Sequence, residues 1–350
     1  MSEFLFREKF DDDSLLFSLA FHPTKPYYAK GFSDGRVTTT KYTLNEDDGT
    51  YTLETVWTTK RHKGSCRGLA YNYDGTHLYS IGTDKTIKMA DAFTGIVHTK
   101  TKEGLEAEPS CIAINDTYLA VGDDSACLNI YNLTDLKLVK SFPDLQEGFI
   151  SSITPLTHKN KYQFVTSGDS KLVHVDIRKG VLKESEDQED EILCGCMAGE
   201  KTGVFGMSEG VLTLWNEYWE DQQNRILLTK ETVDCVIPGE DDDIVFAGCG
   251  DGIVREVDVR AGKILNLYKH SKDSVDIIEF DYDYHLVTAN TDMIKVWKKK
   301  EELSSNEDSD AEQQDEGSKK RKKKKTKSKT KKLARLENMP VKGIAAFDDL

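Results

Sequence analysis

The sequence has no apolar run long enough to cross a bilayer. None of its hydrophobic stretches approaches the ~18 consecutive apolar residues that a membrane helix needs. The first ten residues include Glu3, Arg7, Glu8 and Lys9, which interrupt any signal-peptide core. We therefore expect a soluble protein with no membrane partner, not secreted through an N-terminal signal.

Signatures of catalysis and of cofactor binding are also missing. There is no Gly-Lys-Ser or Gly-Lys-Thr phosphate loop, no glycine pattern for a dinucleotide and no His-Glu-x-x-His sequence. The eight histidines are scattered, and their spacing nominates no catalytic set. We expect a protein that is not an enzyme and that binds no cofactor or metal.

The seven cysteines form no dense disulfide framework in a chain of 350 residues. Cys194 and Cys196 are the one close pair, and a metal site would need a second pair of ligands at suitable spacing. Cys66, Cys111 and Cys235 fall in the first predicted strand of their repeats, where a small buried side chain fits. We expect structural thiols in a reducing compartment.

One pattern recurs seven times: a β-rich run, a polar turn and a second β-rich run. The turns are 50, 40, 46, 39, 42 and 41 residues apart. A period of roughly 40 to 45 residues with the alternation of strands is typical of β-propeller blades. The turns centre on Asp34, Asp84, Asp124, Ser170, Glu209, Asp251 and Asp292.

The repeats resemble the WD-repeat family over about residues 10 to 300. The Trp-Asp dipeptide of that family is degraded here to Ala90-Asp91, Tyr131-Asn132, Val175-Asp176, Trp215-Asn216, Val257-Asp258 and Trp297-Lys298. The resemblance implies a seven-bladed propeller in which a His, a Ser or Thr, an Asp and a Trp form a hydrogen-bonded network within a blade. Repeat seven offers His270, Thr288, Asp292 and Trp297; repeat two offers His62, Ser80 and Asp84 but has Ala90 at the Trp position.

The seventh repeat ends early, because Trp297 is followed at once by three lysines. Its outer strand is therefore missing from the C-terminal side. The N-terminal run, residues 3–10, reads as a strand with Phe4, Phe6 and Phe10 on one face. We predict that it completes blade seven, which would remove two exposed sheet edges.

Two repeats end alike, in an Asp-x-Arg sequence. These are Asp176 with Arg178 and Asp258 with Arg260. The sequences resemble the box that WD-repeat substrate receptors of cullin-RING ubiquitin ligases present to their adaptor, although the Trp before each Asp is missing. The alternative interpretation is that each arginine covers its own blade edge and pairs locally.

Charge divides the chain into separate parts. The formal net charge is −14, and a run with eleven basic residues and no acidic one leaves −25 for the rest. We predict a propeller over residues 1–300, an acidic disordered spacer over 301–317, a lysine-rich segment over 318–332 and a short linear motif over 333–350. The basic residues are Lys319, Lys320, Arg321, Lys322, Lys323, Lys324, Lys325, Lys327, Lys329, Lys331 and Lys332.

The lysine-rich segment is too charged and too poor in apolar residues to fold alone. Such a run is typical of nuclear localisation and of binding to import receptors or to a polyanion such as rRNA. The acidic propeller repels nucleic acid over most of its surface. In the spacer, Ser304, Ser305 and Ser309 each lie three residues before an acid, an arrangement that acidophilic kinases favour.

The whole arrangement resembles the nucleolar WD-repeat proteins associated with large ribosomal subunit biogenesis in fungi and animals. It combines a degenerate propeller, an acidic spacer, polylysine and a terminal Phe-Asp-Asp-Leu. The resemblance implies a non-enzymatic scaffold in the nucleolus, with pre-ribosomal assembly proteins as partners. The alternative function is that of a substrate receptor for a cullin-RING ligase.

Overall fold

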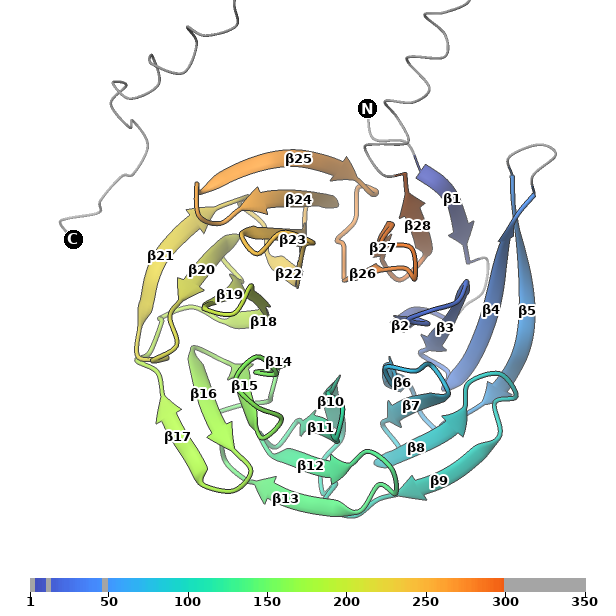
Figure 1. Cartoon of the computed structure of the whole chain (residues 1–350), viewed down its shortest axis with the longest axis horizontal. Coiled ribbons are helices and arrows are strands. Elements are labelled where there is room, and N and C mark those ends of the chain that lie inside the picture. The colour runs from blue at the N-terminus through green and yellow to red at the C-terminus, as the bar shows by residue number, and fades with distance from the viewer. Residues whose placement is uncertain (1–3, 11–13, 46–49, 299–350) are drawn as a thin grey trace, which may run out of the picture. The chain divides into compact units, whose positions relative to one another are not determined.

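Each of the seven turns predicted from the sequence joins the second and third strands of a four-stranded antiparallel sheet. A computed structural model describes residues 4–10, 14–45 and 50–298, and within them the strands form seven such sheets. Figure 1 shows these sheets arranged as blades around one axis. The protein is an all-β, seven-bladed propeller, as the repeat period predicts.

Strands follow each other from the inside of a blade to its outside, and blade seven alone combines both ends of the described chain. Blades one to three consist of β2 (Leu16–Phe21), β3 (Tyr27–Phe32), β4 (Arg36–Leu44), β5 (Tyr51–Lys60); β6 (Cys66–Tyr71), β7 (His77–Gly82), β8 (Thr86–Asp91), β9 (Val97–Thr101); and β10 (Pro109–Ile114), β11 (Tyr118–Asp123), β12 (Leu128–Asn132), β13 (Leu138–Phe142). Blades four and five consist of β14 (Ser152–Pro155), β15 (Gln163–Gly168), β16 (Lys171–Asp176), β17 (Gly180–Glu184); and β18 (Ile192–Ala198), β19 (Thr202–Met207), β20 (Val211–Trp215), β21 (Gln222–Leu227). Blades six and seven consist of β22 (Val233–Pro238), β23 (Ile244–Cys249), β24 (Ile253–Asp258), β25 (Lys263–Lys269); and β26 (Ile277–Phe280), β27 (Leu286–Ala289), β28 (Met293–Trp297), β1 (Phe4–Lys9).

Burial falls from the second strand of a blade to the fourth. In blade two, five of the six residues of β7 are buried, whereas no residue of β9 is. The middle strands are covered on both faces by the neighbouring blades, so their apolar runs are nearly continuous. The outer strands face solvent and carry the polar residues.

A glycine follows the turn centre in blades one, five and six because the next blade approaches closely there. Gly35, Gly210 and Gly252 have φ between 76° and 83°, in the region that residues with a Cβ rarely adopt. A Cβ on Gly35 would lie 2.1 Å from the carbonyl oxygen of Gly64. The carbonyl oxygen of Gly35 accepts hydrogen bonds from the backbone N–H groups of Arg61 and His62. These turns therefore join one blade to the next.

Every outer strand carries one extra residue at the same place. Opposite the Trp position of the third strand, the pairing skips one residue of the fourth, for example His98 between Val97 and Thr99 in blade two. The shift recurs in all seven blades. Such a bulge bends a strand and increases its twist. The degraded dipeptides thus mark a conserved backbone position even where the Trp is absent.

Strand β1 has all the features of an outer strand. It pairs antiparallel with β28, with Phe4 opposite Trp297, and it carries the same bulge, at Leu5. In Figure 1 it lies beside β28 at the end of the ring, next to blade one. The N-terminal run therefore lies where the truncated seventh repeat predicts, and the ring is closed by pairing between the two ends of the propeller.

The bulge overturns one detail of the prediction. Phe6 is buried and packs on Tyr42 of blade one, with ring centroids 5.4 Å apart, and Phe10 packs on Phe32 at 5.7 Å. Phe4 is 43% exposed and instead lies edge-on to Trp297 at 6.4 Å. The three rings do not share one face, because the extra residue shifts the alternation of β1 by one position.

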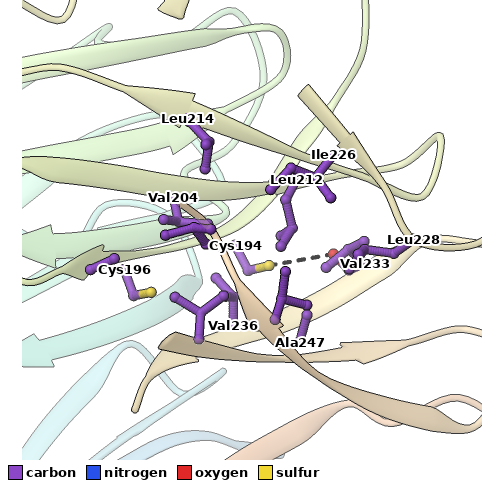
Figure 2. Packing of buried hydrophobic residues seen from close by; sticks show 14 of the residues in the cluster. Cys194, Cys196, Val204, Leu212, Leu214, Ile226, Leu228, Val233, Val236 and Ala247 are labelled. Atoms are coloured by element: carbon purple, nitrogen blue, oxygen red, sulfur yellow. Dashed lines mark hydrogen bonds between the residues drawn. The ribbon is translucent and has the colours of Figure 1, made fainter. Parts of the chain in front are cut away.

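Apolar side chains fill the space between consecutive blades. Figure 2 shows the cluster between blades five and six, where Val204 and Leu212 from one blade meet Val236 and Ala247 from the other. These four side chains are at most 6% exposed. Burial of this kind contributes ~25 cal/mol per Å² of apolar surface, so the stability of the ring rests on its seams between blades.

Candidate functional site

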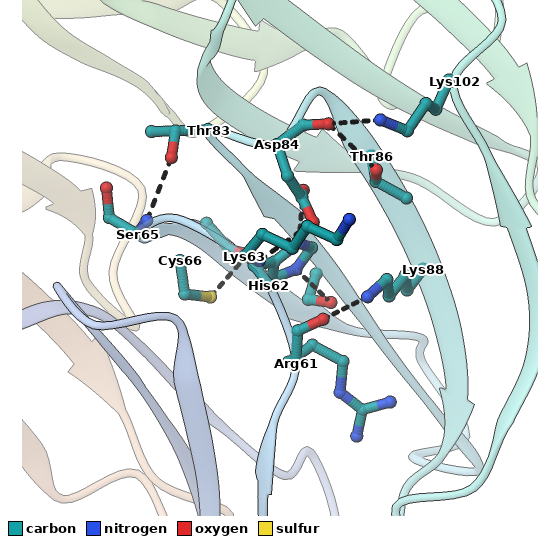
Figure 3. A network of polar contacts seen from close by, with 12 residues as sticks. Arg61, His62, Lys63, Ser65, Cys66, Thr83, Asp84, Thr86, Lys88 and Lys102 are labelled. Atoms are coloured by element: carbon teal, nitrogen blue, oxygen red, sulfur yellow. Dashed lines mark hydrogen bonds and ion pairs between the residues drawn. The ribbon is translucent and has the colours of Figure 1, made fainter.

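Blade two holds three of the four predicted network residues in one chain of hydrogen bonds. Figure 3 shows His62 beside Asp84, with its Nδ1 2.9 Å from Asp84 Oδ1. On its other side, His62 Nε2 lies 3.0 Å from Ser80 Oγ. The backbone N–H of Lys63 donates to Asp84 Oδ2 at 3.1 Å. The network connects the loop before the blade to the turn between its second and third strands. Ala90 stands at the Trp position, as the sequence indicates.

Blade seven keeps a different part of the same network. Trp297 Nε1 donates to Thr288 Oγ1 at 2.9 Å, and that hydroxyl lies 2.7 Å from His270 Nδ1. The side chain of Asp292 accepts a hydrogen bond from Thr291 and is not joined to this chain. The structure thus brings together three of the four predicted residues and leaves Asp292 out.

A turn that is one residue shorter accounts for this difference. Thr288 pairs with Lys295, seven positions further on, whereas the corresponding Ser80 pairs with Lys88, eight positions further on. In blade seven the third strand begins directly after Asp292. The carboxylate is therefore held at the turn by its neighbours and does not extend to the histidine.

Blade six replaces the histidine altogether. Asp251 at the turn centre receives hydrogen bonds from both terminal nitrogens of Arg255, at 2.9 and 2.5 Å, and from the Thr229 hydroxyl at 3.2 Å. The hydrogen bond from Arg255 is the main cause that lowers the pKa of Asp251. The sequence did not predict this pair, because the WD-repeat pattern calls for a histidine in the network; the Arg four residues after the turn Asp was the available signal.

Burial keeps the network histidines neutral. It lowers the pKa of His62 and of His270 to about 4 in each case, although Asp84 opposes the shift at His62. Burial alone would raise the pKa of Asp84, but hydrogen bonds from His62 and Lys63 hold it below its usual range. A group whose pKa lies this far from 7 is a poor acid–base catalyst at neutral pH. The networks hold the blades together.

The two Asp-x-Arg sequences lie on the same face of the propeller but differ in how they are held. Asp176 is fully buried and binds Arg178 through two hydrogen bonds, at 3.1 and 2.9 Å. This contact is the largest cause that lowers the pKa of Asp176 to about 2. The Arg178 guanidinium also stacks over the Tyr162 ring, 4.0 Å from its centroid. Arg178 is therefore paired locally.

Arg260 is far more available than Arg178. Its side chain is 83% exposed and lies 3.7 Å from Asp243, a distance at which an exposed pair contributes little. Asp258 accepts a hydrogen bond from the backbone N–H of Ala261 at 2.7 Å. Both arginines follow third strands, and in an antiparallel blade the loops after strands one and three emerge at one end. A partner on that face would therefore contact Arg260 first.

All seven cysteines are free, and all except Cys127 belong to the apolar clusters of the blades. Cys194 donates a hydrogen bond to the carbonyl oxygen of Val233 at 3.4 Å, and Cys235 does the same to Val275 at 3.2 Å. Burial raises the pKa of both thiols, as it does for Cys196. A thiol held in its neutral form is a poor nucleophile and metal ligand. Across the described part of the chain, no group of three or more His, Cys, Asp or Glu could hold a metal ion.

The contacts that hold β1 in place were not predictable from the sequence. Glu8 accepts hydrogen bonds from Lys30 Nζ at 2.5 Å and from the Tyr28 hydroxyl at 2.7 Å. The side chains of Lys30 and Glu8 are only 6% and 18% exposed. No repeat pattern could have indicated this pair, since the contact occurs at the seam between the first and last blades of the propeller.

The predicted lysine-rich segment, the acidic spacer, the terminal motif and the serines at 304, 305 and 309 lie outside the described residues. Within those residues, no helix is long and apolar enough to span a membrane. The described residues form a closed ring of seven blades, and the hydrogen-bond networks of blades two, six and seven lie within it.

Part of the chain matches a known family of repeats. A family described as "WD domain, G-beta repeat" matches residues 53–91, which comprise the outer strand of blade one and the first three strands of blade two. The sequence repeat is thus offset from the blade by one strand. The same offset assigns β1 to blade seven, as observed.

Proteins described as "WD repeat-containing protein JIP5" are similar to the chain over most of its length. The one from Kluyveromyces lactis is 34% identical over 297 residues, covering 76% of this chain and 57% of its own. The protein from Botryotinia fuckeliana is 34% identical over 345 residues, which cover 83% of this chain and 80% of that protein. The Saccharomyces cerevisiae protein is 31% identical over 289 residues, which cover 73% of this chain and 58% of the yeast protein. The chain thus spans little more than half the length of the Kluyveromyces and Saccharomyces proteins.

Among solved structures, the WD40 β-propeller domain of Doa1 is similar, with a TM-score of 0.72. The alignment covers 86% of this chain and 98% of that domain, at 11% sequence identity. At that identity the likeness concerns the fold.

Proposed function

The chain belongs to the family of WD repeat-containing proteins named JIP5, and we propose that it is a non-enzymatic scaffold in nucleolar assembly of the large ribosomal subunit. WD40 propellers generally serve as binding platforms, and none of the relatives named above is described as an enzyme. The internal networks of blades two, six and seven suit this role, because they stiffen the ring and leave its faces for partners.

One observation carries the proposal: the separation of charge along the chain. Residues 319–332 hold eleven basic residues, while the remaining chain has a formal charge of −25. An acidic ring attracts basic proteins and repels nucleic acid, whereas the lysine-rich segment attracts phosphate. In this proposal the blades bind pre-ribosomal assembly proteins, and the segment binds import receptors and rRNA. Phosphorylation of Ser304, Ser305 or Ser309 would add negative charge beside it.

Two truncations test whether the lysine-rich segment directs the protein to the nucleolus. A fluorescent fusion of residues 1–317 lacks the lysine-rich segment and the terminal motif, and we expect it to lose nucleolar accumulation. A fusion of residues 1–332 keeps the segment and is the matched control; it should still accumulate. If the shorter fusion still concentrates in the nucleolus, the targeting signal lies in residues 1–317, and the proposed targeting role of the lysine-rich segment is wrong.

RNA binding by the same segment should be generic. No aromatic residue interrupts residues 318–332, so bases have no ring to stack on there. Affinity of the full-length protein for unrelated RNAs should fall steeply with salt and differ little between sequences, because counterion release dominates such contacts. The 1–317 protein should bind none of them. Strong preference for one RNA would contradict the proposal.

A second candidate function is supported by the exposure of Arg260. A receptor for a cullin-RING adaptor needs an accessible arginine on this face, and Arg260 is 83% exposed there. Affinity purification separates the two functions: ribosomal and assembly proteins support the scaffold, and the cullin adaptor supports the receptor. In the second case Arg260→Ala should release the adaptor, while Arg225→Ala, an exposed arginine of β21, should not.

A further inference from the structure

A cavity of about 360 Å³ opens between blades six and seven, apart from the networks and the two Asp-x-Arg sequences. Its size lies within the ~300–1,000 Å³ range of ligand pockets. Part of its wall comes from the loop between β22 and β23 and part from the loop between β26 and β27. Both are loops after a first strand, so the cavity lies on the face that also carries Arg260. In Figure 1 these two blades are neighbours at the C-terminal end of the ring.

Four aromatic rings form a continuous wall of this cavity. Phe246 lies 6.1 Å from Tyr268 and 5.5 Å from Phe280, and Phe280 lies 6.3 Å from Tyr284. The contact between Phe246 and Phe280 joins the two blades at an interplanar angle of 88°. Tyr284 at the end of the series is 59% exposed. The wall thus runs from the interior of the seam to solvent.

Three carboxylates also line the cavity. Glu256, on the inner side, is 8% exposed and accepts hydrogen bonds from Asn266 at 2.5 Å and from the Tyr268 hydroxyl at 3.1 Å. Glu240 and Asp241 line the cavity from an exposed loop. Lys298 also lines it, so three carboxylates accompany one ammonium group. The field in the cavity therefore favours a further positive charge.

We propose that this cavity binds a lysine or arginine side chain of a basic peptide in a partner protein. The aliphatic stem of such a side chain would pack along the rings, and its cation would lie over a ring face near the carboxylates. An anionic ligand would be repelled by the carboxylates, and an uncharged apolar ligand would gain no attraction from them. The combination of π faces and carboxylates selects the cation.

The proposal concerns the propeller alone and goes beyond the nucleolar role. Binding can be measured on the purified full-length protein by fluorescence anisotropy with four labelled 12-residue peptides. Each alternates glycine with lysine, arginine, glutamine or norleucine, and norleucine keeps an apolar stem without charge. We expect the lysine and arginine peptides to bind and the other two not to bind. A failure here would leave localisation untouched, so the two proposals fail separately.

Substitution of an uncharged wall residue separates recognition from general attraction to an acidic protein. Tyr284→Asn removes a ring, and asparagine accepts the φ of 58° at this position. We expect affinity to fall about 3- to 30-fold, the range for loss of a cation–π contact. Tyr73→Asn is the matched control: Tyr73 is 57% exposed in the corresponding loop of blade two, and its removal should change nothing.

A second pair tests the carboxylates. Asp241 lines the cavity and its neighbour Asp242 does not, although both are exposed in one loop. Asp241→Asn should weaken binding several-fold more than Asp242→Asn. The proposal is overturned if Tyr284→Asn binds as the natural protein does, or if the two Asp variants weaken binding equally. Thermal melting of each variant shows that the fold is kept, since all four substituted side chains are exposed.

Discussion

The seam between blades five and six and the seam between blades seven and one are held by different chemistry. In the first, apolar side chains meet, and the dashed line in Figure 2 marks the hydrogen bond from Cys194 to the Val233 carbonyl oxygen. The second also has an apolar cluster, which includes Phe6, but it adds the buried ion pair of Glu8 and Lys30.

The outer strands at these two seams are also connected differently. Strands β21 and β25 are each joined to the strand before them by a short turn, so the chain itself keeps them in register. Strand β1 has no such turn to β28, because the two come from opposite ends of the propeller. Apolar packing is not directional, and a strand packed by it alone could slip in register. We infer that the ion pair fixes the register of β1, a specificity role known for buried polar groups.

The largest effect should come from removing the closing strand. Deletion of residues 1–10 exposes the edge of β28, removes the buried Phe6 ring and leaves Lys30 without Glu8. We expect a loss on the order of 5 kcal/mol, which lowers the melting temperature by roughly 10 °C or more. Phe4→Ser is the control on the same strand; its ring is 43% exposed, so it should have a small effect. An unchanged melting temperature after the deletion would contradict closure by β1.

The next effect tests the ion pair by itself. Glu8→Ala leaves the Lys30 ammonium buried without a partner, and we expect it to cost about 3–5 kcal/mol in urea unfolding. The double variant Glu8→Gln with Lys30→Met removes both charges and should recover most of that loss. If the double variant is as unstable as the single one, the pair does more than compensate a buried charge. Asp135→Ala, which breaks a solvent-exposed pair with Lys137, should leave stability unchanged.

The fold could be predicted from the sequence because its period is a local property. All seven turn centres lie between second and third strands, and the degraded dipeptides lie at the ends of third strands. The truncated repeat even indicated the place of β1. These features depend on alternation and turn residues within about 40 positions, which a single chain displays directly.

The features in which individual blades differ from the common repeat could not be predicted. The bulge at Leu5 follows from backbone geometry at the Trp position, and it changed the environment of Phe4. The network in blade seven lacks Asp292 because the turn is one residue shorter, which motif spacing did not show. The cavity between blades six and seven combines residues from two repeats. Each of these depends on distances between segments that the period leaves undetermined.

A smaller effect on stability should depend on pH, and it concerns the seam between blades seven and one. Glu279 of blade seven accepts a hydrogen bond from the backbone N–H of Phe21 in blade one, at 2.7 Å. Burial raises its pKa from 4.5 to about 8, against the influence of that N–H group. Its protonated form therefore stabilises the folded state below pH 4.5, and that contribution is lost as the pH rises through 8.

Glu279→Gln should therefore stabilise the protein by about 1–3 kcal/mol above pH 8 and change little at pH 5. Urea unfolding at the two pH values measures the difference. Val236→Ala, in the apolar seam, is the matched control and should cost the same at both. Equal effects of Glu279→Gln at pH 5 and pH 8.5 would show that this carboxyl group titrates normally in the folded protein.

The smallest effect concerns the thiol at the apolar seam. Cys194 is 8% exposed, and a Cβ placed on Gly206 would lie 2.6 Å from its sulfur, so the space at this point is fully used. Serine is slightly smaller, can still donate to the Val233 carbonyl oxygen, and stands at the corresponding position of blade one as Ser18, opposite Gly31. Cys194→Ser should therefore cost less than about 1 kcal/mol, whereas Cys194→Val adds volume and should cost about 1–3 kcal/mol. Urea unfolding of the two variants decides the matter: if serine costs more than valine, hydrophobicity and not available space governs this position.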